Sequence, residues 1–310
     1  MNIWLGSNIP PAHRASAVTI GNFDGVHTGH LHILQRLKQE ASLRNLQSVV
    51  VIFEPQPNEF FAKQQQRTPT LRLTPMRDKL QLLKNSQCVD EVYVLRFNHL
   101  FAHIPAQQFI QTILRHTLNT RYLLVGDDFR FGQARQGDFD LLCTQTDFIT
   151  ERTPSILVAG ERASSTAVRQ ALVAGRLDQA RHILGHDYIL SGRVKHGKKL
   201  GRILGSPTAN IHLPSHHYAL NGVFVVEAIG TFGKRQGVAS FGFNPTTEHS
   251  TTPKLEVHLF DFQGNLYGER LAINFLHKLR DEKKFTHLDE LTQHIHADID
   301  AARNWWADFQ

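Results

Sequence analysis

Residues 17–41 read AVTIGNFDGVHTGHLHILQRLKQEA, and this stretch decides the fold of the first half of the chain. The short β-branched run at 17–20 is typical of a buried strand, and the glycine-rich residues 21–30 are typical of a turn. Apolar residues then recur at helical spacing, namely Leu31, Leu34, Leu37 and Ala41. A strand, a turn and a helix in series predict the start of a crossover unit in a parallel sheet.

The same alternation continues through the first half of the chain. Further short apolar runs predict strands at residues 49–53, 92–95 and 122–125. Helical spacing predicts helices over residues 74–83, 105–118, 165–175 and 177–184. Strands that alternate with helices predict a doubly wound α/β domain, in which ligands sit at the carboxyl ends of the strands.

The pattern changes near Tyr188, where short, partly alternating segments separated by Gly, Pro and Asn begin. These segments are residues 188–194, 208–213, 222–229, 237–243 and 254–262. They predict an antiparallel β-barrel or sandwich. Within residues 286–306, Leu288, Leu291, Ile295 and Ile299 recur at helical spacing and predict a C-terminal helix. We therefore expect two domains, residues 1–185 and residues 186–310.

Composition narrows the class of protein. The formal net charge of +6 over 310 residues favours anionic partners, either phosphorylated small molecules or nucleic acid. Two cysteines, Cys88 and Cys143, are too few for a disulfide framework or a zinc finger. The N-terminus lacks a signal-peptide pattern, and no apolar run is long enough to span a membrane. These features predict a soluble cytoplasmic protein.

The turn at residues 21–30 places His27 and His30 three apart, at the start of the expected helix. A helix N-terminus attracts anions, glycines let the backbone approach a phosphate closely, and imidazoles can donate hydrogen bonds to phosphate oxygens. A metal site would need further ligands, and no Cys or carboxylate cluster is adjacent. Because the chain has 19 histidines, two solvated surface residues are the third alternative. These ten residues leave all three open.

Two later segments of the first half could also bind a nucleotide. GDDFRFG (126–132) follows an expected strand, so Asp127 can bind a ribose hydroxyl, a base or Mg²⁺, or can simply form a turn. ASSTAVRQAL (163–172) places three hydroxyls and Arg169 at a helix start, where they can hold a phosphate or merely cap the helix. No G-x-G-x-x-G follows a strand, which excludes the dinucleotide fingerprint.

Two segments of the second half contain residues that could bind Mg²⁺ or accept a proton. The Thr208 hydroxyl and the Asn210 amide oxygen, in GSPTANI (205–211), are suitable ligands for Mg²⁺ that carries nucleotide phosphates. In KLEVHLFDF (254–262), Glu256 should face away from the apolar side of the strand and could accept a proton from a substrate hydroxyl. The alternative is a Pro-Thr turn and an ordinary surface Glu.

Seven motifs in this order resemble the prokaryotic bifunctional riboflavin kinase/FMN adenylyltransferase (FAD synthetase) family over about residues 17–303. They are GNFDGVHTGH (21–30), RLTPMRDKL (72–80), GDDFRFG (126–132), SSTAVR (164–169), GSPTAN (205–210), LEVHLFDFQGNLYG (255–268) and LRDEKKF (279–285). The resemblance implies a nucleotidylyltransferase-type (HxGH) domain followed by a riboflavin-kinase-like β-barrel with a C-terminal helix. It also implies ATP as co-substrate, Mg²⁺ as cofactor, and riboflavin and FMN as small-molecule substrates.

For the first domain the resemblance implies that His27 and His30 hold the ATP phosphates and stabilise the departing pyrophosphate. Further nucleotide and phosphate contacts are implied for Gly21, Asn22, Phe23, Asp24, Asp127, Ser164, Ser165, Thr166 and Arg169. FMN would attack the α-phosphorus of ATP directly, with no covalent enzyme intermediate. Catalysis would then consist of positioning and charge stabilisation.

For the second domain the resemblance implies that Thr208 and Asn210 ligate Mg²⁺–ATP and that Arg202 contacts phosphate. Glu256 would be the general base on the ribityl 5′-hydroxyl of riboflavin, and the γ-phosphoryl group of ATP would be transferred to it. The chain departs from the family pattern at four positions, which are Gln56 (often His), Ser206 (usually apolar), Ser240 (usually Asn) and Asn244 (usually Arg).

Three other interpretations are open. In the first, the chain is an active adenylyltransferase whose kinase domain is weak or inactive, because three of the four departures lie in the second domain. The second is a nucleotidylyltransferase acting on a different phosphate, which leaves the second half unexplained. The third is a basic nucleic-acid-binding protein, although Lys and Arg are spread along the chain and no aromatic RNA-binding signature accompanies them. The resemblance itself implies neither a nucleic-acid nor a membrane partner, and the sequence does not indicate an oligomeric state.

Overall fold

The computed structural model describes residues 1–6, 14–154, 156–158, 160–197, 205–247, 250–283, 285 and 287–308. The chain divides into two compact units. The first unit consists of Met1–Thr70 and Lys79–Ser164, and the second of Leu71–Asp78 and Ser165–Gln310.

The first unit is built on a six-stranded sheet in which every pair of neighbours is parallel. In spatial order the strands are β1 (Asn2–Leu5), β4 (Glu91–Arg96), β3 (Gln47–Glu54), β2 (Ser16–Ile20), β5 (Thr120–Gly126) and β6 (Ile149–Thr153). The four predicted strands are the four central ones, which confirms the doubly wound parallel sheet. The edge strands β1 and β6 were not predicted.

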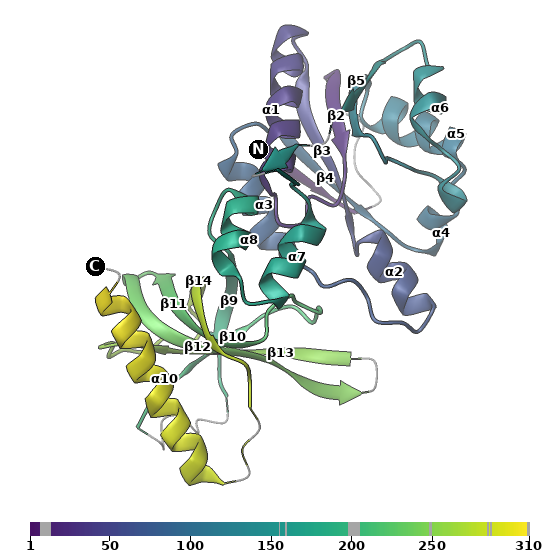
Figure 1. Cartoon of the computed structure of the whole chain (residues 1–310). Coiled ribbons are helices and arrows are strands. Elements are labelled where there is room, and N and C mark those ends of the chain that lie inside the picture. Colours follow the sequence, from purple (N-terminus) through teal and green to yellow (C-terminus); the bar gives the residue numbers. More distant parts are fainter. Residues whose placement is uncertain are drawn as a thin grey trace. The chain divides into compact units, whose positions relative to one another are not determined.

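Helices cover both faces of this sheet (Figure 1). α1 (Thr28–Leu43) packs on β2, β3 and β5 through Leu34, Leu37 and Ala41, as its spacing predicts. On the opposite face, α5 (Ala106–Phe109) and its π-helical continuation η1 (Ile110–Thr117) pack against alternate strand residues such as Val18 and Val51. The remaining elements are α2 (Pro57–Gln64), α3 (Met76–Asn85), α4 (His99–Ala102), the 3₁₀ turn η2 (Gln133–Arg135), α6 (Phe139–Cys143), β7 (Leu157–Val158) and β8 (Glu161–Arg162).

The order of the strands fixes where a ligand can bind in this unit. From β2 the chain adds β3 and β4 on one side, and then crosses to place β5 on the other side of β2. Ligands of open parallel sheets bind beyond the carboxyl ends of the strands at such a reversal. Residues 21–30 follow β2 and Asp127 follows β5, so the topology brings these two predicted segments to the same edge.

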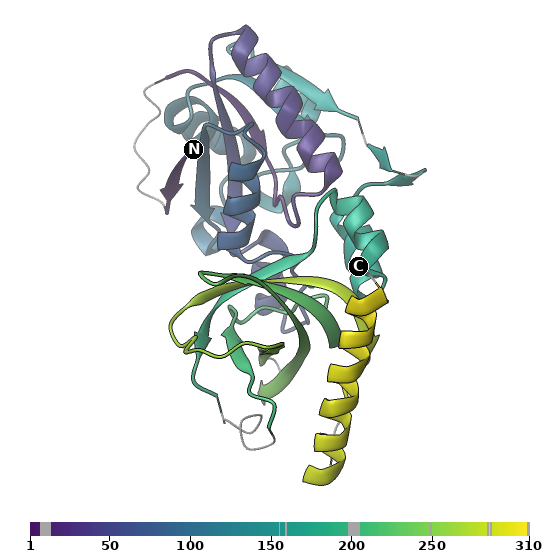
Figure 2. The same ribbon diagram turned by 90° about the vertical axis from the view of Figure 1, so that its left-hand side faces the viewer.

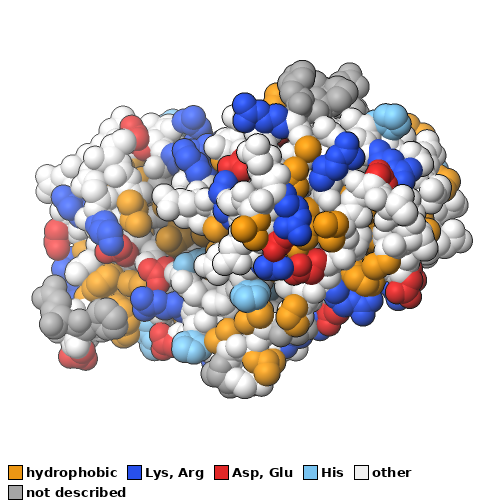
Figure 3. Space-filling model, turned by 90° about the horizontal axis from the view of Figure 1, so that it is seen from above, with side chains coloured by type: hydrophobic (Ala, Val, Ile, Leu, Met, Phe, Trp, Pro, Cys, Tyr) orange, Lys and Arg blue, Asp and Glu red, His pale blue; other side chains and the backbone are white. Residues whose placement is uncertain are grey.

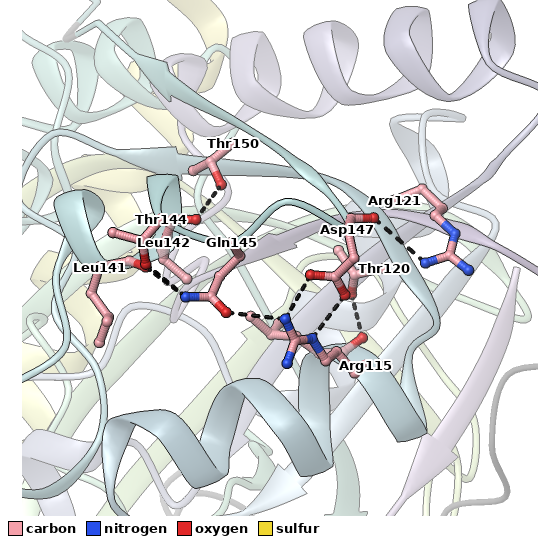
Figure 4. Close-up of polar contacts among 10 residues, drawn as sticks. Arg115, Thr120, Arg121, Leu141, Leu142, Thr144, Gln145, Asp147 and Thr150 are labelled. Atoms are coloured by element: carbon pink, nitrogen blue, oxygen red, sulfur yellow. Dashed lines mark hydrogen bonds and ion pairs between the residues drawn. The ribbon is translucent and has the colours of Figure 1, made fainter.

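A polar network holds η1 to the segment between α6 and β6 (Figure 4). Arg115 donates to both carboxylate oxygens of Asp147, at 2.8 and 2.7 Å, and to the side-chain oxygen of Gln145 at 3.1 Å. Gln145 in turn donates to the Leu141 carbonyl at 3.1 Å, at the end of α6. The network therefore ties a helix on one face of the sheet to the chain that enters the edge strand β6.

We expect Asp147→Asn to destabilise the first unit by about 1 kcal/mol at pH 7, since a partly exposed bidentate pair stabilises by about that amount. The hydrogen bonds from Arg115 hold the pKa of Asp147 below its ordinary value of 3.8. A carboxyl with a lowered folded-state pKa stabilises fully above the unfolded pKa, and this contribution disappears as the pH falls through the folded pKa. Urea unfolding should therefore show a smaller difference in stability between wild type and variant at pH 3 than at pH 7; an equal difference at both values would contradict the assignment.

The second unit is a closed antiparallel barrel of six strands (Figure 2). Around the barrel they are β10 (Ala209–His212), β13 (Ser250–Leu259), β12 (Gly233–Thr247), β11 (Gly222–Gly230), β14 (Arg270–Arg280) and β9 (Ile189–Lys195). The barrel prediction is confirmed, although β14 was not predicted. The predicted C-terminal helix is α10 (Leu288–Asp308), which packs Ile299, Ala302, Trp305 and Trp306 against the outside of the barrel.

Long-range contacts bind residues 71–78 and two helices to the barrel unit. The Tyr188 hydroxyl donates to the Leu73 carbonyl at 2.7 Å, and the Ser191 amide donates to Asp78 at 2.8 Å. α7 (Ser165–Val173) packs on α8 (Leu177–Leu184), which packs on β14. The second compact unit therefore begins its main segment at Ser165, before the predicted boundary after residue 185. The boundary at residue 185 stays a prediction of where one catalytic domain ends and the other begins. None of the helices in the described ranges is both long and apolar enough to cross a membrane.

Candidate active sites

The turn between β2 and α1 has an unusual backbone. Phe23 and Val26 have φ of 46° and 43°, and Gly25 between them has 84°. A β-branched residue in the left-handed region is a steric outlier, and such strain persists only where the surroundings enforce it. Phe23, Asp24 and Val26 are all buried, with at most 2% of their surface exposed. The turn is therefore a fixed, packed loop at the reversal point of the sheet.

The two histidines of this turn form one structural unit. His27 is the N-cap of α1, and its ring nitrogen Nδ1 accepts a 3.4 Å hydrogen bond from the His30 amide. The two rings stack with centroids 3.7 Å apart, and the Phe23 ring lies 4.8 Å from that of His30. His27 is 6% exposed, whereas His30 is half-buried. This packing excludes the alternative of two solvated surface histidines.

A further segment of the first unit lies against the same helix start. A side chain at Gly29 would be 3.2 Å from the Ala163 carbonyl and from the His27 ring, so the close approach requires glycine. Arg162, next to Ala163, pairs with Asp127 at 3.4 Å, and both side chains are half-exposed. The structure thus brings Asp127 and the chain that leads into Ser164 to the edge of the sheet where His27 lies.

The other members of the SSTAVR motif belong to the second unit. Ser165 is the first residue of α7, Thr166 is exposed and the half-buried Arg169 donates from Nε to the Leu71 carbonyl. Ser164 is the last residue of the first unit and is half-buried. A joint role of these residues with His27 stays a prediction.

Sequence analysis missed a cluster of aromatic rings at the same edge of the sheet. Phe53 lies near the end of β3 and Phe97 directly follows β4, with ring centroids 5.8 Å apart. Phe60 and Phe61 of α2 lie 5.4 and 5.8 Å from Phe97, and Phe61 is 37% exposed. No local pattern signals the cluster, because three separate segments supply the rings. It offers flat apolar surface to a planar ring system.

Gln56 adds a polar group to this region. Its side chain is part of the capping box of α2 with Glu59, and the residue is 2% exposed. Its amide Nε2 has no hydrogen-bond partner among the described residues. A buried donor without a partner costs free energy, so an acceptor on a bound ligand would satisfy it.

The barrel places two candidate residues, Asn210 and Glu256, in one row with Ser240 across three neighbouring strands. Asn210 on β10 lies directly opposite Glu256 on β13, and Glu256 lies directly opposite Ser240 on β12. Leu255 and Val257 are buried, at 1% and 0% exposure, while the Glu256 side chain is 28% exposed. The prediction that Glu256 faces away from the apolar side of its strand is confirmed.

Two contacts fix the loop that precedes β10. His258, two residues after Glu256, donates from Nδ1 to the Pro207 carbonyl at 2.9 Å and so holds the residue next to Thr208. A side chain at Gly197 would collide with the Asn210 side-chain amide, so glycine leaves Asn210 in its observed position. Thr208 and Asn210 are half-buried and offer hard oxygens. Arg202 lies outside the described residues.

The described residues contain no group of three or more His, Cys, Asp or Glu side chains that could hold a metal ion. Magnesium that arrives with a nucleotide needs only one or two protein oxygens in addition to phosphate and water. Thr208 and Asn210 fit that requirement.

Comparisons with known proteins match both halves of the chain. An FAD synthetase family model matches residues 9–167, and a riboflavin kinase family model matches residues 184–306. The bifunctional riboflavin kinase/FMN adenylyltransferase of Pseudomonas fluorescens is 43% identical over 96% of this chain and 94% of its own length. The Escherichia coli protein of the same name is 44% identical over 96% of each.

The chain belongs to the bifunctional riboflavin kinase/FMN adenylyltransferase family. A crystal structure described as a macrolide-efflux protein from Streptococcus pneumoniae is also similar, with a TM-score of 0.79 and 28% identity over 98% of this chain and 100% of that one. The FAD synthetase match covers every strand of the parallel sheet except β1, and the riboflavin kinase match covers the closed barrel.

Three of the four departures from the family pattern, Ser206, Ser240 and Asn244, lie in the barrel unit. Ser206 is 4% exposed. The Ser240 hydroxyl donates to Glu282 at 2.9 Å, and a side chain at Gly242 would collide with the Glu282 carboxylate. Asn244 pairs with Thr252 in the sheet, and its side chain lies outside the described part. Asn210 and Glu256 lie directly opposite each other in the barrel of this chain, which carries these departures.

Proposed function

We propose that this chain phosphorylates riboflavin to FMN with ATP and then adenylylates FMN with a second ATP, giving FAD and pyrophosphate. One observation carries the proposal: each of the two matching family models covers the unit whose geometry suits its reaction. The strained turn and the N-cap His27 follow strand β2 of the parallel sheet. Asn210 and Glu256 lie directly opposite each other on neighbouring strands of the barrel.

For the adenylyl transfer we assign anion stabilisation to the start of α1. The imidazoles of His27 and His30 at the N-terminus of this helix would stabilise the negative charge that develops on the departing pyrophosphate. Asn22 and Asp24 shape the pocket beside them, and Asp127 lies near the nucleotide. Gly21, Phe23, Ser164, Ser165, Thr166 and Arg169 complete the proposed nucleotide contacts.

For the phosphoryl transfer we assign the general base to Glu256. Its carboxylate takes the proton from the ribityl 5′-hydroxyl as that oxygen bonds to the γ-phosphorus and the bond to ADP breaks. Thr208 and Asn210 would hold Mg²⁺, which supplies charge neutralisation on the ATP phosphates when bound. The role of Arg202 and the cytoplasmic location stay predictions.

The aromatic cluster is the proposed seat of the FMN ring system. We expect Phe61→Ala to raise the KM for FMN in FAD formation about tenfold, because an exposed ring that stacks on the flavin contributes about 1.4 kcal/mol. Leu100→Ala on α4 is the matched control, since Leu100 is also apolar and is 80% exposed. The KM for riboflavin phosphorylation should not change in either variant. Equal KM values for FMN in the two variants would remove the flavin from this cluster.

The test of the proposal is a time course with purified protein, riboflavin, ATP and Mg²⁺, in which the flavins are separated. FMN that appears first and then gives way to FAD establishes both reactions. Conversion of supplied FMN to FAD without any use of riboflavin would leave an adenylyltransferase with an inactive kinase. No product from either flavin, oxidised or reduced, would overturn the proposal.

The remaining alternative, a nucleic-acid-binding protein, has less support. In Figure 3, Lys and Arg side chains are interspersed with Asp and Glu over the face that is drawn, and no large basic patch stands apart. Binding of nucleic acid relies on a clustered basic surface. The net charge of +6 suits anionic substrates such as ATP and FMN equally well.

A further inference from the structure

Glu256 has a cationic neighbour that no part of the proposed mechanism uses. Lys254 lies two residues earlier on β13, so both side chains project from the same side of the strand. Its ammonium nitrogen is 3.1 Å from Oε2 of Glu256. No described residue donates a hydrogen bond to the other carboxylate oxygen, Oε1, so this oxygen is available to a substrate hydroxyl.

The other groups that face Glu256 cannot replace Lys254. From β12, Ser240 has a single hydroxyl proton and donates it to Glu282. From β10, Asn210 is neutral, and Lys195 lies beyond it on β9. On β13 itself, His258 donates to the Pro207 carbonyl. Lys254 is therefore the one charged partner of Glu256 among the residues that the structure describes.

A second carboxylate makes this positive charge more important. Glu282 lies over Gly242, and Gly242 is the residue directly opposite Lys254 in the sheet. Glu282 thus brings a second negative charge to the strands beside Glu256. The Lys254 ammonium, 3.1 Å from Oε2, holds the Glu256 carboxylate in place against the repulsion between the two.

The pair contributes little to folding. The Lys254 and Glu256 side chains are 48% and 28% exposed, and a lysine–carboxylate pair at such exposure stabilises a protein by about 0–1 kcal/mol. A role in holding the fold is therefore weak, whereas a role in orienting the Glu256 carboxylate needs only the observed contact.

We infer that Lys254 is a positioning residue of the kinase site. It fixes Glu256 through Oε2 and leaves Oε1 to accept the proton of the riboflavin 5′-hydroxyl as that oxygen attacks the γ-phosphorus of ATP and ADP leaves. This inference rests on the proposed role of Glu256 as the general base.

The test compares Lys254→Met, Lys254→Arg and Lys234→Met in the full-length protein. Lys234 is the matched control, because it pairs with Glu227 at 2.8 Å in the same barrel, away from the row of Asn210, Glu256 and Ser240. We expect Lys254→Met to lower kcat for riboflavin phosphorylation about tenfold, because the carboxylate of the base is then no longer held in place. The KM values for riboflavin and ATP should stay within about twofold, because Lys254 acts through the base and not on substrate binding.

Lys254→Arg should recover most of the rate, and Lys234→Met should behave like wild type. Thermal unfolding that matches wild type shows that the barrel unit of each variant is folded. If Lys254→Met matches Lys234→Met in kcat, the inference is wrong. If Glu256→Gln also leaves the kinase unchanged, the proposed base has failed, which is a different result. A rise in KM for ATP with unchanged kcat would make Lys254 a substrate contact and overturn the positioning role.

Discussion

Replacement of His27 by asparagine is expected to lower the rate of FAD formation from FMN and ATP by about 10²–10³-fold. His27 caps α1 and stacks on His30 with ring centroids 3.7 Å apart. Asparagine is among the best N-cap residues, so the helix keeps its cap while the imidazole is lost. The variant therefore separates the chemistry of the ring from the stability of the turn, which a change to alanine would not do.

The control for this substitution is His32→Gln. His32 is an exposed residue of the same helix and should tolerate the change without loss of either activity. Riboflavin phosphorylation in the His27→Asn protein reports the state of the barrel unit, and thermal unfolding reports the state of the sheet. FAD formation at the wild-type rate in a folded His27→Asn protein would refute the phosphate role of this turn.

Burial on two faces explains why the sequence predicts the centre of the sheet but not its edges. β2 is buried at every position, and β4 at all but its last, so both appear as continuous β-branched or apolar runs. β1 carries three exposed residues among its four, and β6 has Ile149 exposed at 54%. An edge strand is positioned by its hydrogen bonds to the neighbouring strand, and its own residues do not form a continuous apolar run that would predict it.

The candidate sites divide in a similar way. The histidine turn and the Asn210 and Glu256 segments were predictable, because each stands in one short stretch whose residue types suit phosphate, magnesium or proton transfer. The rings of Phe53, Phe61 and Phe97 were not, because long-range strand order brings them together. The packing of residues 71–78 with the barrel unit was not predictable for the same reason. It depends on long-range hydrogen bonds from the Tyr188 hydroxyl and the Ser191 amide.

Replacement of Glu256 by glutamine is expected to lower riboflavin phosphorylation by about 10²–10⁴-fold, the range that a general base contributes. Glutamine has nearly the same shape and can keep its place opposite Asn210 and Ser240, but its amide cannot take the proton from the 5′-hydroxyl. Loss of the partly exposed pair with Lys254 costs the fold at most about 1 kcal/mol. A large fall in rate therefore reports on chemistry.

Glu227→Gln is the matched control, because Glu227 carries an equivalent pair with Lys234 on the same barrel. In both variants FMN should still be converted to FAD at the wild-type rate, since that reaction is assigned to the first unit. The supplied flavin then distinguishes the outcomes: a Glu256→Gln protein that makes FAD from FMN but not from riboflavin has lost only the base. A Glu256→Gln protein that phosphorylates riboflavin normally would require another proton acceptor in the barrel. Glu282 would be the first to test, because the hydroxyl of Ser240 already holds it one strand away from Glu256.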